Sequence, residues 1–232
     1  MLAAGGGMLM PRDAPPLLVQ YSLELSGRGR PRLCVLNTAL GDDPNAYLRL
    51  YDRLADSPAR VRHLTLFPMP NVRDPEDFLL SQDVIFVGGG SVANMLAVWR
   101  VHGIDEILRK AWQAGIVLAG SSAGAICWFA GGTTDSFGPR LRPYTDGLEM
   151  LAGSFCPHYS SEAQRRPLYQ RLVADRTLPG GLACDEGAAV HFVDDTLTEV
   201  VSDRPRAGAF QVEPDGAGGS TETQLTVRYL RV

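Results

Sequence analysis

The hydrophobic positions of the chain come in short apolar runs that alternate with amphipathic segments. Short continuous or alternating apolar runs are typical of strands, whereas apolar residues spaced three and four apart are typical of helices. The runs that we predict to be strands are residues 32–39, 62–67, 83–87 and 116–119. The segments that we predict to be helices are residues 44–54, 91–100, 104–114 and 123–129.

The order of these elements predicts the fold class. Strand and helix patterns alternate and are joined by short glycine-rich turns, which indicates a mostly parallel sheet with helices on both faces. Towards the C-terminus, residues 190–193, 198–201 and 223–230 are predicted to be antiparallel strands, with a turn or flexible loop at 213–222. We therefore predict a single α/β domain over residues 1–232, built as a three-layer α/β/α sandwich.

Composition narrows the classes of partner. The 232 residues are 45% hydrophobic and 21% charged, with a formal net charge of −4. This balance lacks the basic surface that nucleic acid or an anionic membrane requires, so neither is an expected partner. No apolar run approaches the roughly 20 residues that span a bilayer, and the N-terminus lacks a basic segment followed by a long apolar one. We therefore expect neither a membrane span nor a signal peptide.

The four cysteines, Cys34, Cys127, Cys156 and Cys184, form no CxxC pair. Three of them stand in apolar contexts, where a free thiol behaves as a small buried hydrophobic group. Buried free thiols indicate a reducing compartment, so we expect the protein to be cytoplasmic.

The first candidate for chemistry is a run of small residues between a predicted strand and a predicted helix, Gly120-Ser121-Ser122-Ala123-Gly124. It matches the pattern G-x-S-x-G, in which small flanking residues let the backbone turn sharply and expose the central serine at a helix N-terminus. Ser122 is therefore the candidate nucleophile, and the backbone N–H of Ala123 is a candidate donor to an oxyanion. Plain helix–strand packing or a helix cap is the alternative interpretation of the same residues.

A second run, Gly88-Gly89-Gly90-Ser91, follows the predicted strand 83–87. The carboxyl ends of parallel strands form the sheet edge where ligands bind, so a glycine N–H here is a candidate second oxyanion donor. A phosphate-binding turn or a plain tight loop is the alternative. No lysine follows the glycines as in a Walker motif, and the run Gly5-Gly6-Gly7 lacks the spacing of a dinucleotide-binding motif.

A serine nucleophile requires a base, and the chain has four histidines. His63 and His102 precede the serine and lack a context of small polar residues. His158 follows an apolar approach and a proline on an expected loop at a strand end, which favours it as the base. His191 lies within an apolar strand pattern, where a packed histidine is common, and is the alternative.

Three carboxylates are candidates for the third group of a triad. Asp185 and Glu186 follow a strand-like segment, and only one of them can serve because adjacent strand residues point to opposite faces. Asp135 lies among turn residues just past the helix that follows the serine. If His158 and Glu186 complete the triad, the residues follow the chain order Ser-His-acid. The α/β-hydrolases have the order Ser-acid-His instead. Pairing His191 with Asp185, or His158 with Asp135, would give that order. Chain order therefore leaves the acid open.

Four motifs resemble, in order and spacing, those of peptidase family S51, which contains peptidase E (the α-aspartyl dipeptidase) and cyanophycinase. The motifs are residues 87–91, 120–125, 153–159 and 185–188. The resemblance runs from about residue 30 to residue 200, and four motifs together are much more specific than any one. It implies a class I glutaminase-like, flavodoxin-related α/β/α sandwich, which agrees with the alternation of strands and helices.

The resemblance also implies roles for individual residues. Ser122 matches the nucleophile, His158 matches the base, and the N–H groups of Gly89 and Ala123 match the oxyanion donors. Such a site performs acyl transfer, in which the serine attacks a carbonyl and the histidine first takes and then returns its proton.

The resemblance leaves two candidates for the acid. Glu186, directly before Gly187, matches the family's acidic residue better than Asp185 does. Asp135 resembles an aspartate that peptidase E carries on the equivalent loop and that is also assigned to the charge relay. Glu186 is the acid that we predict, with Asp135 and Asp185 as the alternatives.

Two departures from the family pattern concern substrate recognition. Relatives tend to carry a polar residue two positions before the histidine, where Cys156 stands in this chain. The segment after the histidine is here the compact run 159–167. In it, Arg165 and Arg166 are candidates to bind an acidic side chain of the substrate, although neither aligns with an arginine of the family. The other candidate substrate-binding residues are Gly88, Gly90 and Ser91.

We therefore expect a serine peptidase of short peptides, with peptides that begin with aspartate as one candidate substrate class. A cyanophycinase-like hydrolase of aspartate-rich polymer is one alternative, and a non-catalytic small-molecule-binding protein on the same fold is another. A glutaminase is disfavoured, because that chemistry uses cysteine where Ser122 stands. No metal or cofactor is needed, and we expect a monomer or a homodimer.

Overall fold

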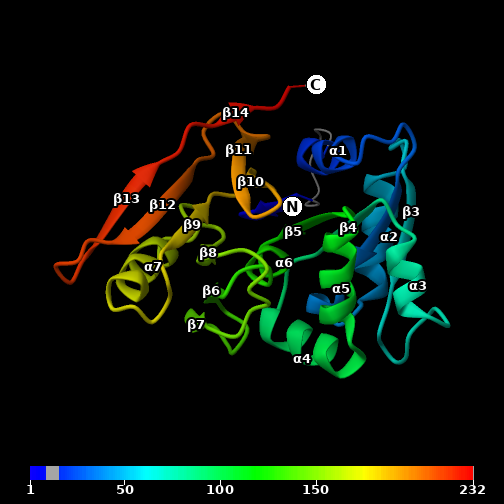
Figure 1. Cartoon of the computed structure of the whole chain (residues 1–232), viewed down its shortest axis with the longest axis horizontal. Coiled ribbons are helices and arrows are strands. Elements are labelled where there is room, and N and C mark those ends of the chain that lie inside the picture. The colour runs from blue at the N-terminus through cyan, green and yellow to red at the C-terminus, as the bar shows by residue number, and fades with distance from the viewer. Residues whose placement is uncertain (9–15, 232) are drawn as a thin grey trace.

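A computed structural model describes residues 1–8 and 16–231 and shows the larger of two β-sheets at the centre of the molecule (Figure 1). Its strand order is β14-β11-β10-β1-β5-β4-β2-β3. The strands are β1 (Leu2–Ala4), β2 (Arg32–Leu36), β3 (Arg60–Leu64), β4 (Val84–Val87), β5 (Val117–Ser121), β10 (Ala188–Val193), β11 (Thr196–Ser202) and β14 (Arg228–Tyr229). From β1 to β3 all neighbours are parallel, whereas β10 is antiparallel to both β1 and β11.

Helices cover both faces of this sheet. One face carries α1 (Leu17–Glu24) and α2 (Pro44–Arg53), and the other carries α3 (Pro75–Leu80), α4 (Val92–His102) and α5 (Ile104–Gln113). The alternation of side chains along a strand produces the two cores. In β4, Val84 and Phe86 join the core beneath α1 and α2, whereas Ile85 and Val87 join the core on the opposite face. The predicted α/β class with a mostly parallel sheet between helices is confirmed.

A second sheet extends the molecule beyond this sandwich, in the order β13-β12-β9-β8-β6-β7. Its strands are β6 (Gly131–Thr134), β7 (Arg142–Tyr144), β8 (Ser154–Cys156), β9 (Gly181–Cys184), β12 (Ala209–Pro214) and β13 (Ser220–Gln224). Helix α7 (Arg165–Ala174) packs on it, and Figure 1 shows α7 and the β12–β13 hairpin on the side of the molecule away from α2 to α5. Sequence patterning indicated only residues 181–184 and the end of β13 in this sheet, partly because β6, β7 and β8 have only three or four residues each.

The short helix α6 (Ala123–Ile126) connects the two sheets. It contacts β5 of the larger sheet and β6 and β8 of the smaller one. Just after it, the ring of Phe129 stacks on that of Phe155 in β8, with the ring centroids 5.2 Å apart. The residues that follow β5 are therefore held from both sheets.

Some predicted elements differ from the structure in extent. The predicted strand 62–67 is β3, which ends at Leu64 because the N–H groups of Leu66 and Phe67 donate to the Asp42 carboxylate instead of to a neighbouring strand. The predicted helix 123–129 ends at Ile126, because the N–H groups of Trp128 and Phe129 bond three residues back, to the carbonyls of Ala125 and Ile126 at 3.3 and 3.1 Å. A tightened last turn of this kind lets the chain leave the helix.

The C-terminal prediction needs a larger correction. The segment 213–222, predicted as a loop, contains the end of β12 and the start of β13, and residues 223–230 are divided between β13 and β14. The strands β12 and β13 pair from Phe210–Gln224 to Pro214–Ser220. The strand β13 has no apolar residue, and β12 ends in Glu213 and Pro214, so hydrophobic patterning does not detect this hairpin.

In the ranges 1–8 and 16–231, no helix has both the length and the apolar character needed to cross a bilayer. The four cysteines are buried and unpaired. Burial raises the pKa of the Cys34 thiol to about 12, so this thiol stays protonated and packs as a hydrophobic group.

A substitution in the strand that leads to Ser122 tests the core. Leu118→Ala removes a fully buried side chain from β5, and we expect it to lower the free energy of unfolding by about 2–5 kcal/mol, because the cavity left behind refills only partly. Leu48→Ala on α2 is the matched control, since Leu48 is 68% exposed, and we expect it to change stability by less than about 0.5 kcal/mol. Urea unfolding measures both variants, and equal losses would contradict this core.

Candidate active site

Ser122 occupies a sharp turn between β5 and α6. Its φ of 56° and ψ of −115° lie outside the regions that non-glycine residues usually adopt, so the turn is strained. The flanking glycines make it possible. A Cβ on Gly120 would lie 1.9 Å from the Gly124 carbonyl oxygen, and a Cβ on Gly124 would lie 2.3 Å from the Val87 carbonyl oxygen. The turn therefore requires both glycines of the G-x-S-x-G pattern.

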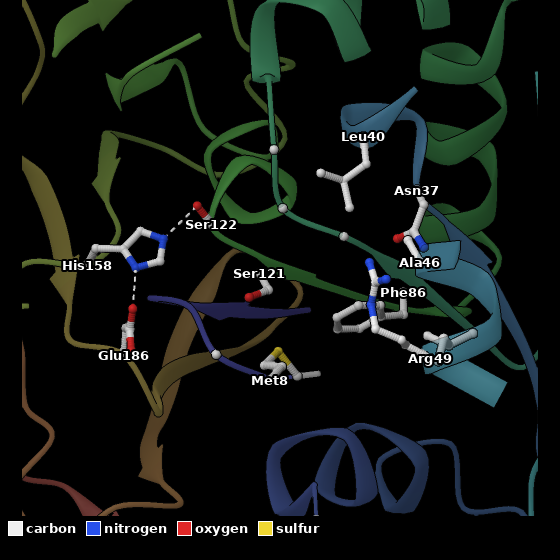
Figure 2. A pocket seen from close by; sticks show the side chains of 15 residues that line it. Met8, Asn37, Leu40, Ala46, Arg49, Phe86, Ser121, Ser122, His158 and Glu186 are labelled. Atoms are coloured by element: carbon white, nitrogen blue, oxygen red, sulfur yellow. Dashed lines mark hydrogen bonds and ion pairs between the residues drawn. The ribbon is translucent and has the colours of Figure 1, made fainter. Parts of the chain in front are cut away.

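His158 lies between Ser122 and Glu186 (Figure 2). Its Nε2 is 2.9 Å from Ser122 Oγ, and its Nδ1 is 3.0 Å from Glu186 Oε1. An ionised carboxylate only accepts hydrogen bonds, so Nδ1 carries the proton, and Nε2 of the neutral ring is then the acceptor for the Ser122 hydroxyl. The three side chains form a hydrogen-bonded relay with the geometry that can activate a serine nucleophile.

Glu186 is held in its ionised form. Its partial burial would raise its pKa, but the hydrogen bond from His158 and the hydrogen bond and charge of Arg204 outweigh burial and lower the pKa below its usual value. Arg204 Nη1 lies 3.2 Å from Glu186 Oε2, the oxygen that His158 does not use. Arg204, which sequence reasoning did not identify, thus positions the carboxylate and favours its charge.

The backbone of residues 4–6, at the end of β1, lies beneath the relay. The carbonyls of Ala4, Gly5 and Gly6 accept from the N–H groups of Ser122, His158 and Gly187 at 3.0, 2.8 and 3.1 Å. Sequence reasoning tested this glycine run only as a nucleotide-binding motif and missed this role.

Gly6 is the most restricted residue of this segment. Its φ is 137°, and a Cβ there would lie 2.4 Å from His158 Cε1 and 2.8 Å from Nδ1. Any side chain at this position would displace the His158 ring. The signal that could have indicated it is a glycine run directly after a strand-length apolar start.

The two expected oxyanion donors adjoin Ser122. A Cβ on Gly89 would lie 3.1 Å from Ser122 Cβ, so this backbone packs directly against the serine, and Ala123 follows it in the chain. Within the described part of the chain, neither the N–H of Gly89 nor that of Ala123 donates to a protein acceptor. Both donors are available to an oxygen bound beside Ser122.

The alternative acids lie elsewhere. The Asp185 carboxylate accepts from the N–H groups of Ser160 and Gly208, both at 2.9 Å, and so joins two loops and does not contact His158. Asp135 lines a depression beside Ser122 and His158, but no hydrogen bond between Asp135 and His158 is present. Of the three predicted carboxylates, the structure brings only Glu186 onto His158.

The other histidine candidates have different partners. His191 Nδ1 is 2.9 Å from the Tyr21 hydroxyl on the far part of the larger sheet, and its pKa is lowered by burial. His63 Nδ1 is 2.7 Å from the Tyr51 hydroxyl. Neither is hydrogen-bonded to Ser122.

The two arginines predicted to bind substrate are placed differently. Arg165 is only 2% exposed and lines the depression beside Ser122, where it donates to Glu162 Oε2 at 2.6 Å and to the Thr133 carbonyl at 2.8 Å. Arg166 pairs with Glu222 and lies over the rings of Tyr159 and Phe210, away from Ser122. Arg166 lines neither hollow beside Ser122, because its guanidinium connects α7 to the β12–β13 hairpin.

Two hollows meet at Ser122. A cavity of about 340 Å³ runs from the relay past Gly88, Gly89 and Gly90 towards α2, and Figure 2 shows the side chains that line it. A second hollow of about 360 Å³ lies on the other side and includes Ser91 and Asp135. All three glycines and Ser91, the predicted substrate-binding residues of this loop, therefore border the space around the serine. Cys156 does not, because its thiol is buried against Thr133 Oγ1 at 3.0 Å.

The chain is similar to proteins that are named as peptidases. The model of peptidase family S51 matches residues 1–200. A Bacillus subtilis (strain 168) protein named "Uncharacterized peptidase YgaJ" is 45% identical over 230 residues, which is 99% of this chain and 98% of that protein. "Peptidase E" of Shewanella denitrificans is 30% identical over 189 residues, which is 77% of this chain and 78% of that protein.

A solved structure has the same fold. The crystal structure of a peptidase from an acI-B1 Actinobacterium has a TM-score of 0.66, covers 97% of this chain and 93% of its own, and is 17% identical in sequence. At that identity the likeness concerns the fold alone.

A substitution at Gly6 tests whether the N-terminal backbone positions His158. We expect Gly6→Ala to slow the labelling of Ser122 by a fluorophosphonate about 10²-fold, because the new Cβ displaces the ring. Gly218→Ala is the control, since Gly218 also has a positive φ, of 94°, and nothing lies within 4 Å of the added Cβ. Labelling rates are compared for variants whose circular dichroism matches the wild type, and equal rates would contradict the role of Gly6.

A substitution at Arg204 tests the charge of Glu186. In the wild type the pKa of Glu186 is lowered, so its pairing with His158 persists as the pH falls through the ordinary range for glutamate, about 4.3. Without Arg204 the carboxylate protonates at a higher pH, so the midpoint of the Glu186 carboxyl titration, followed by 13C NMR, moves to higher pH in Arg204→Gln. Arg100→Gln, which breaks the ion pair with Asp146, is the control and leaves this midpoint unchanged. A midpoint that is unchanged in both variants contradicts the coupling.

Proposed function

This chain belongs to peptidase family S51, and from that premise we propose that it is a serine peptidase of short peptides. We assign the nucleophile to Ser122, the base to His158 and the orienting acid to Glu186. The observation that carries the proposal is the continuous relay from Ser122 Oγ through both ring nitrogens of His158 to Glu186, with distances of 2.9 and 3.0 Å.

The mechanism follows from the hydrogen bonds. His158 Nε2 takes the hydroxyl proton as Ser122 Oγ attacks the scissile carbonyl carbon, and the N–H groups of Gly89 and Ala123 bind the oxygen that becomes negative. Glu186 stabilises the imidazolium through Nδ1. When the C–N bond breaks, the imidazolium gives its proton to the leaving amine, and the acyl group stays on Ser122. A water molecule then attacks the ester with His158 as base, which releases the acid and restores the serine.

The size of the site supports short peptides over a polymer. The cavity of about 340 Å³ is near the lower end of the range of ligand pockets, about 300–1,000 Å³, and residues of α2 line one side of it. Arg165 supports aspartate recognition only weakly, because its guanidinium already binds Glu162 and Thr133. The preformed relay favours a peptidase over a non-catalytic binding protein. A serine that only packs between a strand and a helix would not require a strained backbone conformation.

We keep a cytoplasmic location as part of the proposal, because four buried, unpaired cysteines suit a reducing compartment. The substrate is a short peptide, and the mechanism requires no cofactor.

Single substitutions test the relay. Ser122→Ala and His158→Ala are expected to lower kcat/KM on a panel of dipeptides by about 10⁴–10⁶-fold, because the nucleophile and its base act as a unit. His191→Ala is the matched control, since His191 contacts Tyr21 and not the serine, and it should keep a near-normal rate. Turnover is followed by release of free amino acids, and Ser122 labelling by a fluorophosphonate is measured on the same proteins. A His158→Ala enzyme that keeps its activity rules the proposal out.

A further inference from the structure

The cavity beside Ser122 extends away from the relay towards α2, where its walls change character. The apolar residues that line it are Met8, Leu40, Ala46, Leu50 and Phe86. Met8, Leu50 and Phe86 are almost wholly buried, so they form a rigid wall contributed by three separate parts of the chain. An apolar side chain that enters this space gains about 25 cal/mol for each Å² removed from water, whereas a charged one would lose its hydration.

Asn37 adds a polar group to this apolar wall. It is only 5% exposed, and its backbone N–H donates to the Tyr47 hydroxyl at 3.2 Å. Its side-chain amide lines the cavity and has no hydrogen-bond partner in residues 1–8 and 16–231. A Cβ on Gly88 would lie 2.3 Å from Asn37 Oδ1, so the glycine leaves room for this amide. An amide that faces the cavity without a protein partner is suited to bind a ligand oxygen, because its N–H groups need not give up another acceptor in the protein.

Arg49 supplies a positive charge at the same end. Figure 2 shows Asn37 and Arg49 on the side of the cavity opposite to His158 and Glu186. Arg49 Nη2 is 3.8 Å from Asp43 Oδ2, and its side chain is 61% exposed, so this ion pair is long and solvated and leaves the guanidinium able to bind a ligand. Among the described residues that line the cavity, Arg49 is the only arginine or lysine.

The opposite side of Ser122 has the opposite charge. Its hollow contains Asp135, Glu162 and Arg165, and Arg165 is already paired with Glu162. Asp135 is exposed and its carboxylate has no partner in the described part of the chain. A carboxylate without a partner on one side of the nucleophile and a solvated, weakly paired guanidinium on the other complement the two charged ends of an unblocked dipeptide.

We propose that Asn37 and Arg49 bind the free C-terminal carboxylate of a dipeptide whose second side chain is apolar and occupies the space beside Phe86 and Leu40. The proposal rests on the serine peptidase mechanism above and specifies its substrate class. The ammonium group faces Asp135, the scissile carbonyl lies at Ser122, and the leaving amino acid occupies the cavity beside α2. Longer or C-terminally blocked peptides place no charge at Arg49 and are poor substrates.

Matched substrates test the carboxylate site. Wild-type enzyme is assayed with Ala-Leu and with Ala-Leu amide, which differ in one charge. A hydrogen-bonded charge of this kind contributes about 1.5–3 kcal/mol, so kcat/KM is expected to be about 10- to 100-fold higher for the free acid. Ala-Leu is also expected to be cleaved faster than Ala-Asp and Ala-Lys, because the wall is apolar.

Variants assign the preference to the two residues. Arg49→Gln is expected to raise KM for Ala-Leu about tenfold with little change for the amide, because this arginine binds substrate and takes no part in the bond-breaking step. Asn37→Asp, which is nearly isosteric, is expected to reverse the preference by placing a negative charge beside the carboxylate. Arg28→Gln is the matched control, since Arg28 makes a similarly long pair, 3.9 Å to Asp83, at the other edge of the sheet.

The failure of this inference is distinguishable from that of the peptidase mechanism. Equal kcat/KM for acid and amide in an enzyme whose Ser122 is labelled by fluorophosphonate overturns the carboxylate site and leaves the mechanism intact. An acid preference that survives Arg49→Gln overturns the assignment to Arg49. If Ser122 is neither labelled nor required for turnover, the mechanism fails. In that case the carboxylate site is tested by calorimetry, as the binding of L-leucine and of leucinamide to the Ser122→Ala protein. Equal affinity for the two ligands refutes the site.

Discussion

Three consecutive backbone carbonyls hold the candidate active site together. Those of Ala4, Gly5 and Gly6 accept from the N–H groups of Ser122, His158 and Gly187, which belong to segments far apart in the chain. Backbone hydrogen bonds in a buried strand end are costly to break and permit little displacement, so they keep the side chains of Ser122, His158 and Glu186 within hydrogen-bonding distance. Glycine at position 6 is part of the same constraint, because a Cβ would occupy the place of the imidazole.

The two sheets meet at this point. Ser122 follows β5 of the larger sheet, His158 follows β8 of the smaller one, and Glu186 lies in the turn that leads from β9 in the smaller sheet to β10 in the larger. The relay therefore forms only when both sheets are folded and docked. The hollows on either side of the serine differ in charge because different sheets supply their charged residues. Asp135 comes from the segment after β6 of the smaller sheet, whereas Arg49 comes from α2 on the larger sheet.

Hydrophobic patterning predicted the larger sheet better than the smaller one. The runs that became β2, β4 and β5 are buried on both faces, so nearly every position is apolar and the signal is strong. The strand β1 has only three residues, Leu2–Ala4, and it is recognisable as a strand only through its pairing with β5 and β10. The strand β13 is polar and largely exposed, and β12 buries Ala209, Phe210 and Val212 but ends in polar and exposed positions, so the pairing of this hairpin, and not its pattern, defines it.

For the candidate site, local sequence determined what a sharp turn and a catalytic base require: small residues around Ser122, glycines beside it at positions 88–90, and a histidine on a later loop. The tertiary structure decided the rest. Asp185 and Glu186 are adjacent carboxylates with similar intrinsic chemistry, and only the packing of loops places Glu186 on His158 and Asp185 on two backbone N–H groups. Arg204 and Asn37 carry no local signature either, because their positions relative to the site arise from contacts across the fold. The local sequence thus determines which residues have the chemistry to react, because it fixes the turn and its small neighbours. Long-range packing determines which of these residues come within hydrogen-bonding distance of one another.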